Sequence, residues 1–154
     1  MNETSQTFED DKIIKIVSQY IDLTVTPFGQ TPRSVVRVDK RDPMYGGNGI
    51  VYLLQMFGVN ELINNRIGAY MVLLNKNDEA GFHTHGDRNE QELYIVMHGE
   101  GEYLDKAGEN GEIRKQKLLK GSITAVKDTG FHSVKNIKDE PLIIFVITTN
   151  KQKN

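Results

Sequence analysis

The sequence contains no cysteine and no tryptophan, and only four of its 154 residues are histidine. Without cysteine the chain has no disulfide, no thiolate metal ligand and no cysteine nucleophile, which is typical of a protein from a reducing compartment. Its apolar runs, such as PLIIFVITT, are far shorter than the ~20 residues that a membrane-spanning helix needs. The first residues, MNETSQTFEDDK, are polar and acidic, unlike a secretory signal. We therefore expect a cytoplasmic protein with no membrane partner.

An excess of charge of one sign is also missing. The chain has 19 Lys and Arg against 21 Asp and Glu, a net charge of -2, and the two signs alternate in stretches such as VDKRDP and GENGEIRKQK. A basic stripe is the usual electrostatic mark of a surface that binds nucleic acid. We therefore expect no nucleic-acid partner. The length predicts one domain, large enough to bury a core.

Short apolar segments alternate with turn residues along most of the chain. Segments such as IVYLLQMF, ELYIVMH and PLIIFVITT are separated by DPMYGGNG, NKNDEAG and DKAGENG, which are typical turn sequences. Many short strands without a long helical pattern between them predict an all-β sandwich or barrel. We assign this antiparallel β domain to residues 34–150. The glycines of DPMYGGNG are expected to form a strand-to-strand turn, because the Lys and Ser/Thr of a phosphate-binding loop are absent.

Residues 1–33 are expected to form a short N-terminal tail and extension. The first 12 or so residues predict a mobile tail. Apolar positions over residues 11–22 partly fit a helix, with Asp10 or Asp11 as its cap, but their β-branched content fits a strand nearly as well.

Three of the four histidines lie in one stretch, AGFHTHGDRNEQELYIVMHGEG. Alternate residues of a strand project to the same face, so His83 and His85 would together form half of a chelate. Imidazole suits divalent first-row metals, and a carboxylate or a third histidine from a neighbouring strand would complete the site. Glu92 reaches the same point if its strand folds back beside the first, and His132 lies on a later strand. On spacing alone, histidines that only form hydrogen bonds remain an alternative.

These residues resemble the two motifs of the cupins, G-x5-H-x-H-x(3 or 4)-E-x6-G and G-x5-P-x-G-x2-H-x3-N. The first motif is matched by His83, His85, Glu92 and Gly99, and the second by Gly121, His132 and Asn136. The resemblance implies an antiparallel jelly-roll β-barrel with one divalent transition metal near one mouth. It also implies that the metal, which is Fe, Mn, Ni, Zn or Cu, is held by His83, His85, Glu92 and His132.

The sequence departs from both motifs. Asn77 stands at the leading glycine, and Lys127 and Thr129 replace the proline and glycine of the second motif. Six residues separate His85 from Glu92 instead of three or four. Glu90 would restore the shorter gap and has the same strand parity as Glu92, so it remains an alternative ligand or a nearby base.

Other side chains are expected to surround the metal. Tyr94 and Val96 share a face with Glu92, and Tyr94 is the candidate for a general acid or a substrate hydrogen bond. Four further residues on the strands before and after are expected to line the interior: Tyr70, Val72, Phe145 and Ile147. His98 is expected to be a surface residue and Asn136 a structural one. Arg66 and Arg88 are the only basic residues that we can suggest near the site.

Three neutral imidazoles and one carboxylate leave open positions on a divalent ion. We therefore predict a metal-dependent enzyme acting on a small organic molecule, either an oxidoreductase such as a dioxygenase, or an isomerase, epimerase or lyase. The alternative is a non-catalytic module that binds or senses a small molecule, and an empty barrel that only mediates assembly is a third. The resemblance also implies a homodimer. Metal affinity should weaken as the pH falls toward ~6.5, where histidine becomes protonated.

Overall fold

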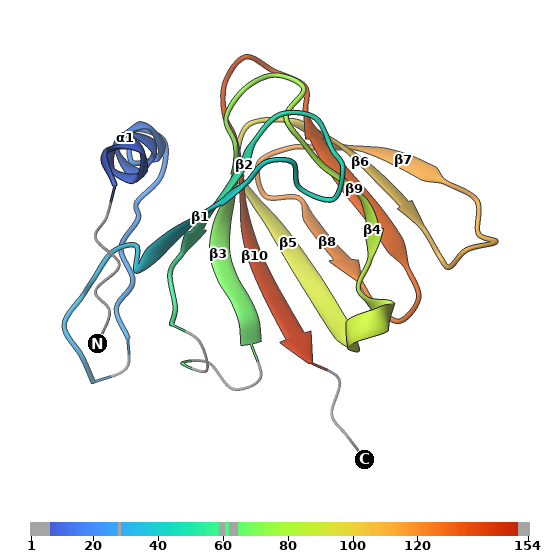
Figure 1. Cartoon of the computed structure of the whole chain (residues 1–154), viewed down its shortest axis with the longest axis horizontal. Coiled ribbons are helices and arrows are strands. Elements are labelled where there is room, and N and C mark those ends of the chain that lie inside the picture. The colour runs from blue at the N-terminus through green and yellow to red at the C-terminus, as the bar shows by residue number, and fades with distance from the viewer. Residues whose placement is uncertain (1–6, 28, 59–60, 62–64, 151–154) are drawn as a thin grey trace.

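Two antiparallel β-sheets face each other in the computed structural model, and an α-helix near the N-terminus packs on the outside (Figure 1). The structure describes residues 7–27, 29–58, 61 and 65–150, with the exception of the side chains of residues 65 and 66. The six-stranded sheet has the order β1 (Arg37–Arg41), β2 (Val51–Gln55), β3 (Asn65–Leu73), β10 (Leu142–Asn150), β5 (Glu90–His98) and β8 (Ile123–Val126). The four-stranded sheet has the order β4 (Glu79–Thr84), β9 (Phe131–Asn136), β6 (Gly101–Lys106) and β7 (Arg114–Leu118). The expected all-β, antiparallel architecture is confirmed.

The main core fills the space between the two sheets. Alternate residues of each strand point inward, as on β3, where Ile67, Ala69 and Met71 are 4% exposed or less. Burying a side chain as large as Ile67 or Met71 contributes about 1.5–3 kcal/mol relative to leaving it exposed. This core holds the two sheets at a fixed separation, and any group on their inner faces is placed with the same rigidity.

The outer face of the six-stranded sheet is covered in part by α1 (Phe8–Val17). Ile13 and Val17 of the helix pack with residues of β2, β3 and β10 in a second apolar cluster, which includes Tyr52, Leu54, Val72 and Ile143. The helix begins inside the segment that the sequence predicted as a mobile tail, and residues 1–6 of that tail lie outside the described residues. The alternative prediction of a strand in this segment is wrong.

The helix is capped by Thr7, so the prediction of Asp10 or Asp11 as the cap is also wrong. The Thr7 hydroxyl accepts a hydrogen bond from the Asp10 backbone N–H at 3.2 Å, and the Asp10 carboxylate accepts one from the Thr7 N–H at 3.0 Å. This reciprocal capping box satisfies two donors that the first turn of a helix leaves free.

Four residues that the sequence placed in the interior instead face outward: Tyr70, Val72, Phe145 and Ile147. Tyr70, Val72 and Phe145 belong to the second cluster under the helix, while their neighbours Met71 and Val146 fill the main core. The prediction failed because both faces of β3 and β10 are covered, so both faces are apolar and hydrophobicity does not reveal which one is inside.

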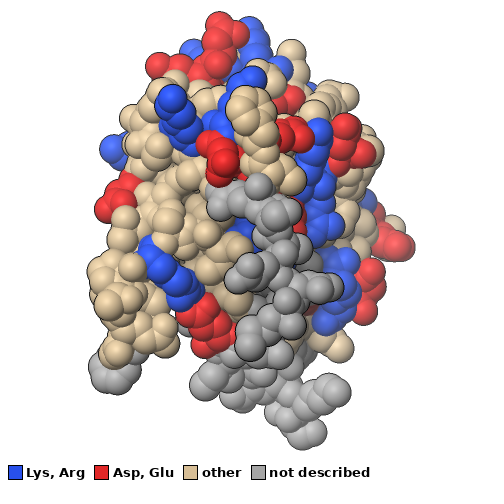
Figure 2. Space-filling view, turned by 60° about the vertical axis from the view of Figure 1, so that its left-hand side comes forward, with Lys and Arg blue, Asp and Glu red and all other residues tan. Residues whose placement is uncertain are grey.

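The face that carries α1 shows acidic and basic side chains interspersed, without a large area of one sign (Figure 2). No helix within the described part of the chain has the length and apolar character needed to cross a membrane.

Candidate metal centre

Four residues bring their ligand atoms to one place between the sheets. His83, His85, Glu92 and His132 each offer one nitrogen or oxygen atom, and these four atoms all lie within 4.8 Å of one another. All four side chains are buried, with between 1% and 8% of each residue exposed.

The two sheets both contribute to this group. His83 on β4 and His132 on β9 are direct register partners in the four-stranded sheet, and Glu92 projects from β5 in the opposite sheet. His85 follows the end of β4 and precedes a short 3-10 helix, η1 (Gly86–Arg88). The ligand atoms therefore meet across the sandwich.

Two geometric expectations from the sequence are corrected here. β5 does not fold back beside β4, because β4 pairs with β9 and β5 pairs with β8 and β10. His85 is not on the strand, since its backbone has φ -104° and ψ -2°. The turn at η1 carries the chain from one sheet to the other. The six residues between His85 and Glu92 span this crossing.

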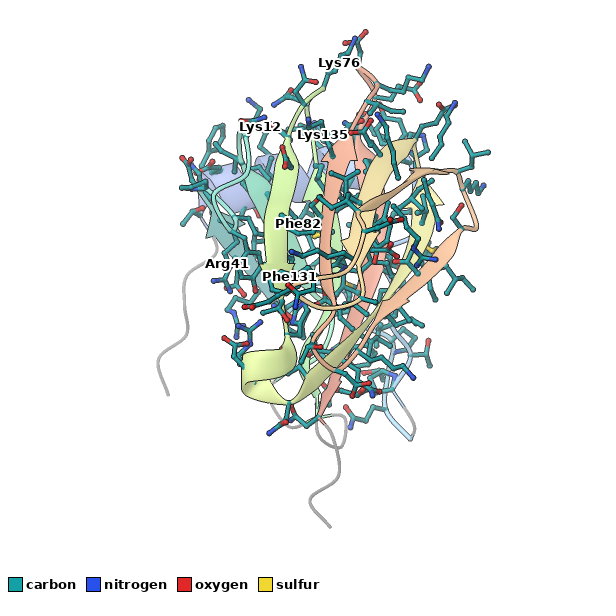
Figure 3. The ribbon with its side chains drawn as sticks, turned by 90° about the vertical axis from the view of Figure 1, so that its right-hand side faces the viewer. Lys12, Arg41, Lys76, Phe82, Phe131 and Lys135 are labelled. Carbon is teal, nitrogen blue, oxygen red and sulfur yellow. The ribbon has the colours of Figure 1, made fainter. Side chains whose placement is uncertain are left out.

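The outer face of the same strands carries an aromatic pair. Phe82 on β4 and Phe131 on β9 lie side by side, with their ring centroids 5.7 Å apart (Figure 3). The Lys106 ammonium lies 4.7 Å from the centroid of the Phe131 ring. Because Phe82 and Phe131 each precede a histidine in sequence, their outward position agrees with an inward position of His83 and His132.

The spacing of the ligand atoms suits one metal ion. The Nε2 atom of His85 lies 3.0 Å from Nε2 of His83 and 3.2 Å from Nε2 of His132. Glu92 Oε1 lies 3.2 Å from His85 Nε2 and 3.3 Å from His132 Nε2. Ligands bound at about 2.1 Å around a tetrahedral or octahedral ion are separated by about 3.0–3.4 Å.

The second ring nitrogen of each histidine has a partner on the side away from this point. Nδ1 of His83 donates to the Gly81 carbonyl at 2.6 Å. Nδ1 of His85 lies 3.2 Å from the Glu90 carboxylate, and Nδ1 of His132 lies 3.0 Å from the Tyr103 hydroxyl. With the proton on Nδ1, each Nε2 lone pair is directed to the centre of the group. Metal-binding histidines are almost always oriented in this way.

The electrostatics favour the metal-binding forms of His83 and Glu92, whereas His85 has a raised pKa and must lose a proton that it holds more tightly than usual before it binds a metal. Burial, together with the nearby His132 and His85, lowers the pKa of His83 to about 4, so this ring is neutral at neutral pH. For Glu92, burial works against ionisation, but hydrogen bonds to His132 and His85 outweigh it and lower the pKa. For His85, burial is likewise outweighed by contacts with Glu92 and Glu90, and its pKa is raised. The donor set and its spacing therefore fit a divalent ion.

Glu90 and Tyr94, the two predicted catalytic residues, both lie next to the group. Glu90 is 4% exposed and contacts Nδ1 of His85, whereas Glu92 offers the ligand oxygen. Tyr94 is 1% exposed and its ring stacks on His132 with a centroid distance of 5.0 Å. Burial and the neighbouring Glu92 raise the pKa of Tyr94 well above its usual value, so its hydroxyl stays protonated. Their catalytic roles stay predictions.

Two tyrosines of the centre were not predicted. Tyr103 supports His132 and lies on the same face of β6 as the buried Gly101, but the mixed sequence GEYLDK does not mark that face as the inner one. Tyr45 stacks on His83 with a centroid distance of 3.7 Å and an interplanar angle of 9°. It comes from the glycine-rich turn between β1 and β2, and nothing in the local sequence indicates a site there.

Asn136 and His98 have structural contacts outside the group. The Asn136 amide is fully buried and donates to the carbonyls of Leu73 and Glu140, in agreement with its expected structural role. His98 is partly buried, with its Nδ1 bound to the Pro141 carbonyl at 2.9 Å. The side chain of Arg66 lies outside the described residues.

No family model matches the sequence, and no curated protein matches it. Among solved structures, a predicted oxalate decarboxylase from Thermotoga maritima is similar at 23% identity and a TM-score of 0.64, over 74% of this chain and 92% of that one. The Cnp3 cupin domain of Schizosaccharomyces pombe matches at 13% identity and a TM-score of 0.55, over 79% of this chain and 77% of that one. KdgF from Halomonas sp. matches at 12% identity and a TM-score of 0.52, over 73% and 89%. These identities show the fold alone, which is the cupin fold that the two motifs predicted.

Proposed function

We propose that this cupin-fold chain binds one divalent transition-metal ion through His83, His85, Glu92 and His132, and that the ion acts on a small organic molecule. The observation that carries the proposal is the convergence of three Nε2 atoms and one carboxylate oxygen within 4.8 Å. Nε2 of His85 lies 3.0 Å from Nε2 of His83 and 3.2 Å from Nε2 of His132, and such close nitrogen lone pairs in a buried site are unfavourable without a cation or proton between them.

The protein's own part in this function is orientation. Gly81, Glu90 and Tyr103 each fix one histidine ring from behind, so the three lone pairs keep a common direction. Burial keeps bulk water away and strengthens every charge interaction at the centre. When bound there, a divalent ion supplies Lewis acidity, which polarises a carbonyl or lowers the pKa of a bound water.

The proposed enzyme would catalyse one of two classes of reaction. One is an oxidoreductase of the dioxygenase type acting on a chelating diol, enol or keto acid, and the other is an isomerase, epimerase or lyase acting next to a carbonyl. A non-catalytic role in binding or sensing is the second candidate. One observation favours this role: the hydroxyl of Tyr94, the candidate general acid, is hydrogen-bonded to Glu92.

Metal analysis of matched variants tests the proposal. Wild-type protein and a His83→Ala/His132→Ala double variant are loaded with Zn, Mn, Fe, Ni or Cu, dialysed and measured by elemental analysis. We expect about one ion per wild-type chain and less than a tenth of that in the double variant. His98→Ala is the control, since it removes the one histidine outside the group. Equal metal content in wild type and double variant contradicts the proposal.

A conservative variant covers the case in which the double variant does not fold. Glu92→Gln keeps the shape of the side chain but removes its charge, and we expect its metal affinity to fall at least tenfold. Circular dichroism then reports whether the fold is retained. Turnover or O2 uptake of the loaded protein with candidate substrates separates an enzyme from a binding module, which would be stabilised by its ligand without altering it.

Three further expectations stay predictions: the boundary between residues 33 and 34, the homodimer and the cytoplasmic location. Sedimentation equilibrium at several protein concentrations tests the dimer.

A further inference from the structure

We propose that the ligand of this metal centre carries a carboxylate, received by the Tyr45 hydroxyl and the Arg88 guanidinium. This inference rests on the proposed function and adds the chemical class of the ligand. Its starting point is the position of Tyr45, whose ring covers one face of His83 while 40% of the residue stays exposed. Tyr45 therefore lies between solvent and a proposed metal ligand.

The Tyr45 side chain is held in this position at a cost. Its backbone has φ +50°, in the left-handed region, which costs a residue other than glycine about 1–2 kcal/mol. The turn is fastened to the ligand strand, because the N–H groups of Gly47 and Gly81 both donate to the Met44 carbonyl at 3.0 Å. A Cβ atom at either glycine would collide with the backbone of the opposite segment. A strained residue held by such a tight contact is typical of a functional position.

Arg88 joins this phenol to the metal ligands. Its Nη2 atom lies 3.4 Å from the Tyr45 hydroxyl and 3.1 Å from Nδ1 of His85, and its Nε donates to the Glu90 carboxylate at 3.3 Å. The side chain is 36% exposed. A guanidinium and a phenol placed together at the edge of a buried site offer several hydrogen-bond donors to a carboxylate.

A small hollow adjoins Tyr45. A hollow of about 110 Å³ is lined by Arg41, Pro43, Met44, Tyr45, Leu53 and Ile67. Leu53 and Ile67 also belong to the main core, so the hollow lies at the edge of the space between the sheets. Its volume is well below the roughly 300–1,000 Å³ of sites for drug-sized ligands. Its lining includes Tyr45 but neither Arg88 nor a proposed metal ligand, so it borders the proposed carboxylate position and does not define it.

The charges select an anion over a neutral molecule. Glu92 leaves a divalent ion with one positive charge in excess, and the charges of Glu90 and Arg88 offset each other at 3.3 Å. Asp87, at 3.8 Å from Arg88, is 66% exposed, so its charge is screened by solvent. Arg41, at the hollow, adds further positive potential. Uncompensated charge in a buried site is costly, and one carboxylate removes that excess, whereas a neutral carbonyl leaves it in place.

Acetate and acetamide form a matched pair of probes, because they have the same shape and differ in charge. Each is titrated into the Co(II)-loaded full chain while the visible absorption of cobalt is followed. We expect acetate to bind at least tenfold more tightly than acetamide. Tyr45→Phe and Arg88→Lys should each weaken acetate binding about five- to tenfold without changing the binding of acetamide. Tyr20→Phe and Arg37→Lys, the same two changes made outside the site, should bind acetate like the wild type.

The outcomes separate this inference from the function on which it rests. If the chain takes up no cobalt, both are overturned. If cobalt is held but acetamide binds as tightly as acetate, or if both variants bind acetate within twofold of the wild type, the carboxylate site alone is overturned. Inorganic phosphate binding more tightly than acetate would also overturn it, because the ligand class would then be a phosphate.

Discussion

Tyr103→Phe is the sharpest test of how the centre is organised. The Tyr103 ring is 2% exposed and its hydroxyl lies 3.0 Å from Nδ1 of His132. Burial raises the pKa of Tyr103 to about 12, so the hydroxyl stays protonated over the usual range of pH. Phenylalanine keeps the ring and removes only the oxygen. The variant thus leaves His132 in place but takes away the group that orients it.

The magnitude follows from the loss of one buried partner. Leaving the Nδ1–H of His132 unsatisfied costs about 1–3 kcal/mol of folding stability. Loss of the group that orients a metal-binding histidine lowers metal affinity by about 10–100-fold, or roughly 1.4–2.7 kcal/mol. We therefore expect a Tyr103→Phe protein that folds, is less stable without metal and binds metal at least tenfold more weakly.

Competition with a coloured chelator measures the affinity, and urea unfolding measures the stability. Tyr52→Phe is a suitable control, because the Tyr52 hydroxyl also has a hydrogen bond, at 2.9 Å to Glu9, but on the far side of the six-stranded sheet. This control should lose some stability and no metal affinity. If Tyr103→Phe binds metal within twofold of Tyr52→Phe, His132 does not depend on Tyr103 for its orientation, and the reasoning is refuted.

Four further outcomes are expected. Removing bound metal with a chelator should lower the melting temperature by about 5–10 °C relative to protein with metal at 100 times its Kd, since such binding contributes about 2.7 kcal/mol. Metal affinity should fall as the pH drops, and the loss should begin above pH 6.5. Contacts with Glu92 and Glu90 outweigh burial and raise the pKa of His85, whose protonated form binds no metal. A metal affinity that is constant between pH 7.5 and 5.5 would contradict this. Asn136→Ala should cost roughly 2–4 kcal/mol of unfolding free energy, as three hydrogen bonds are lost, while the folded protein keeps its metal affinity. Gly81→Ala should cost about 1–3 kcal/mol and weaken metal binding, because the new methyl group meets the Tyr45 backbone, whereas Gly58→Ala, which meets only a flexible side chain, should be tolerated.

The fold class could be predicted because turn sequences separate the strands of this chain at short intervals. The site residues could be predicted because two histidines one residue apart, a downstream carboxylate and a later histidine match two short motifs. The motifs do not show how the strands that carry these residues are arranged in space. His83 and Glu92 lie on different sheets, and only the pairing of β4 with β9 reveals this. That pairing joins segments about 50 residues apart in the sequence.

The remaining errors have two physical sources. Tyr70 and Phe145 were placed inside because β3 and β10 are apolar on both faces, a consequence of α1 covering the outer one. Tyr45 could not be found because a tyrosine in a glycine-rich turn has no periodicity, and its position depends on the contact of that turn with β4. Long-range contacts decided both cases, and local patterns do not report them.

The division of the ligand atoms between two layers has a mechanical consequence. An ion held at once by His83 on β4, His132 on β9 and Glu92 on β5 would link the two sheets and oppose their separation. We then expect backbone amides of β10 and β6, which hold no ligand residue, to exchange hydrogen more slowly in metal-bound protein than in metal-free protein. Whether the metal site is occupied would in this way set how often the two sheets separate.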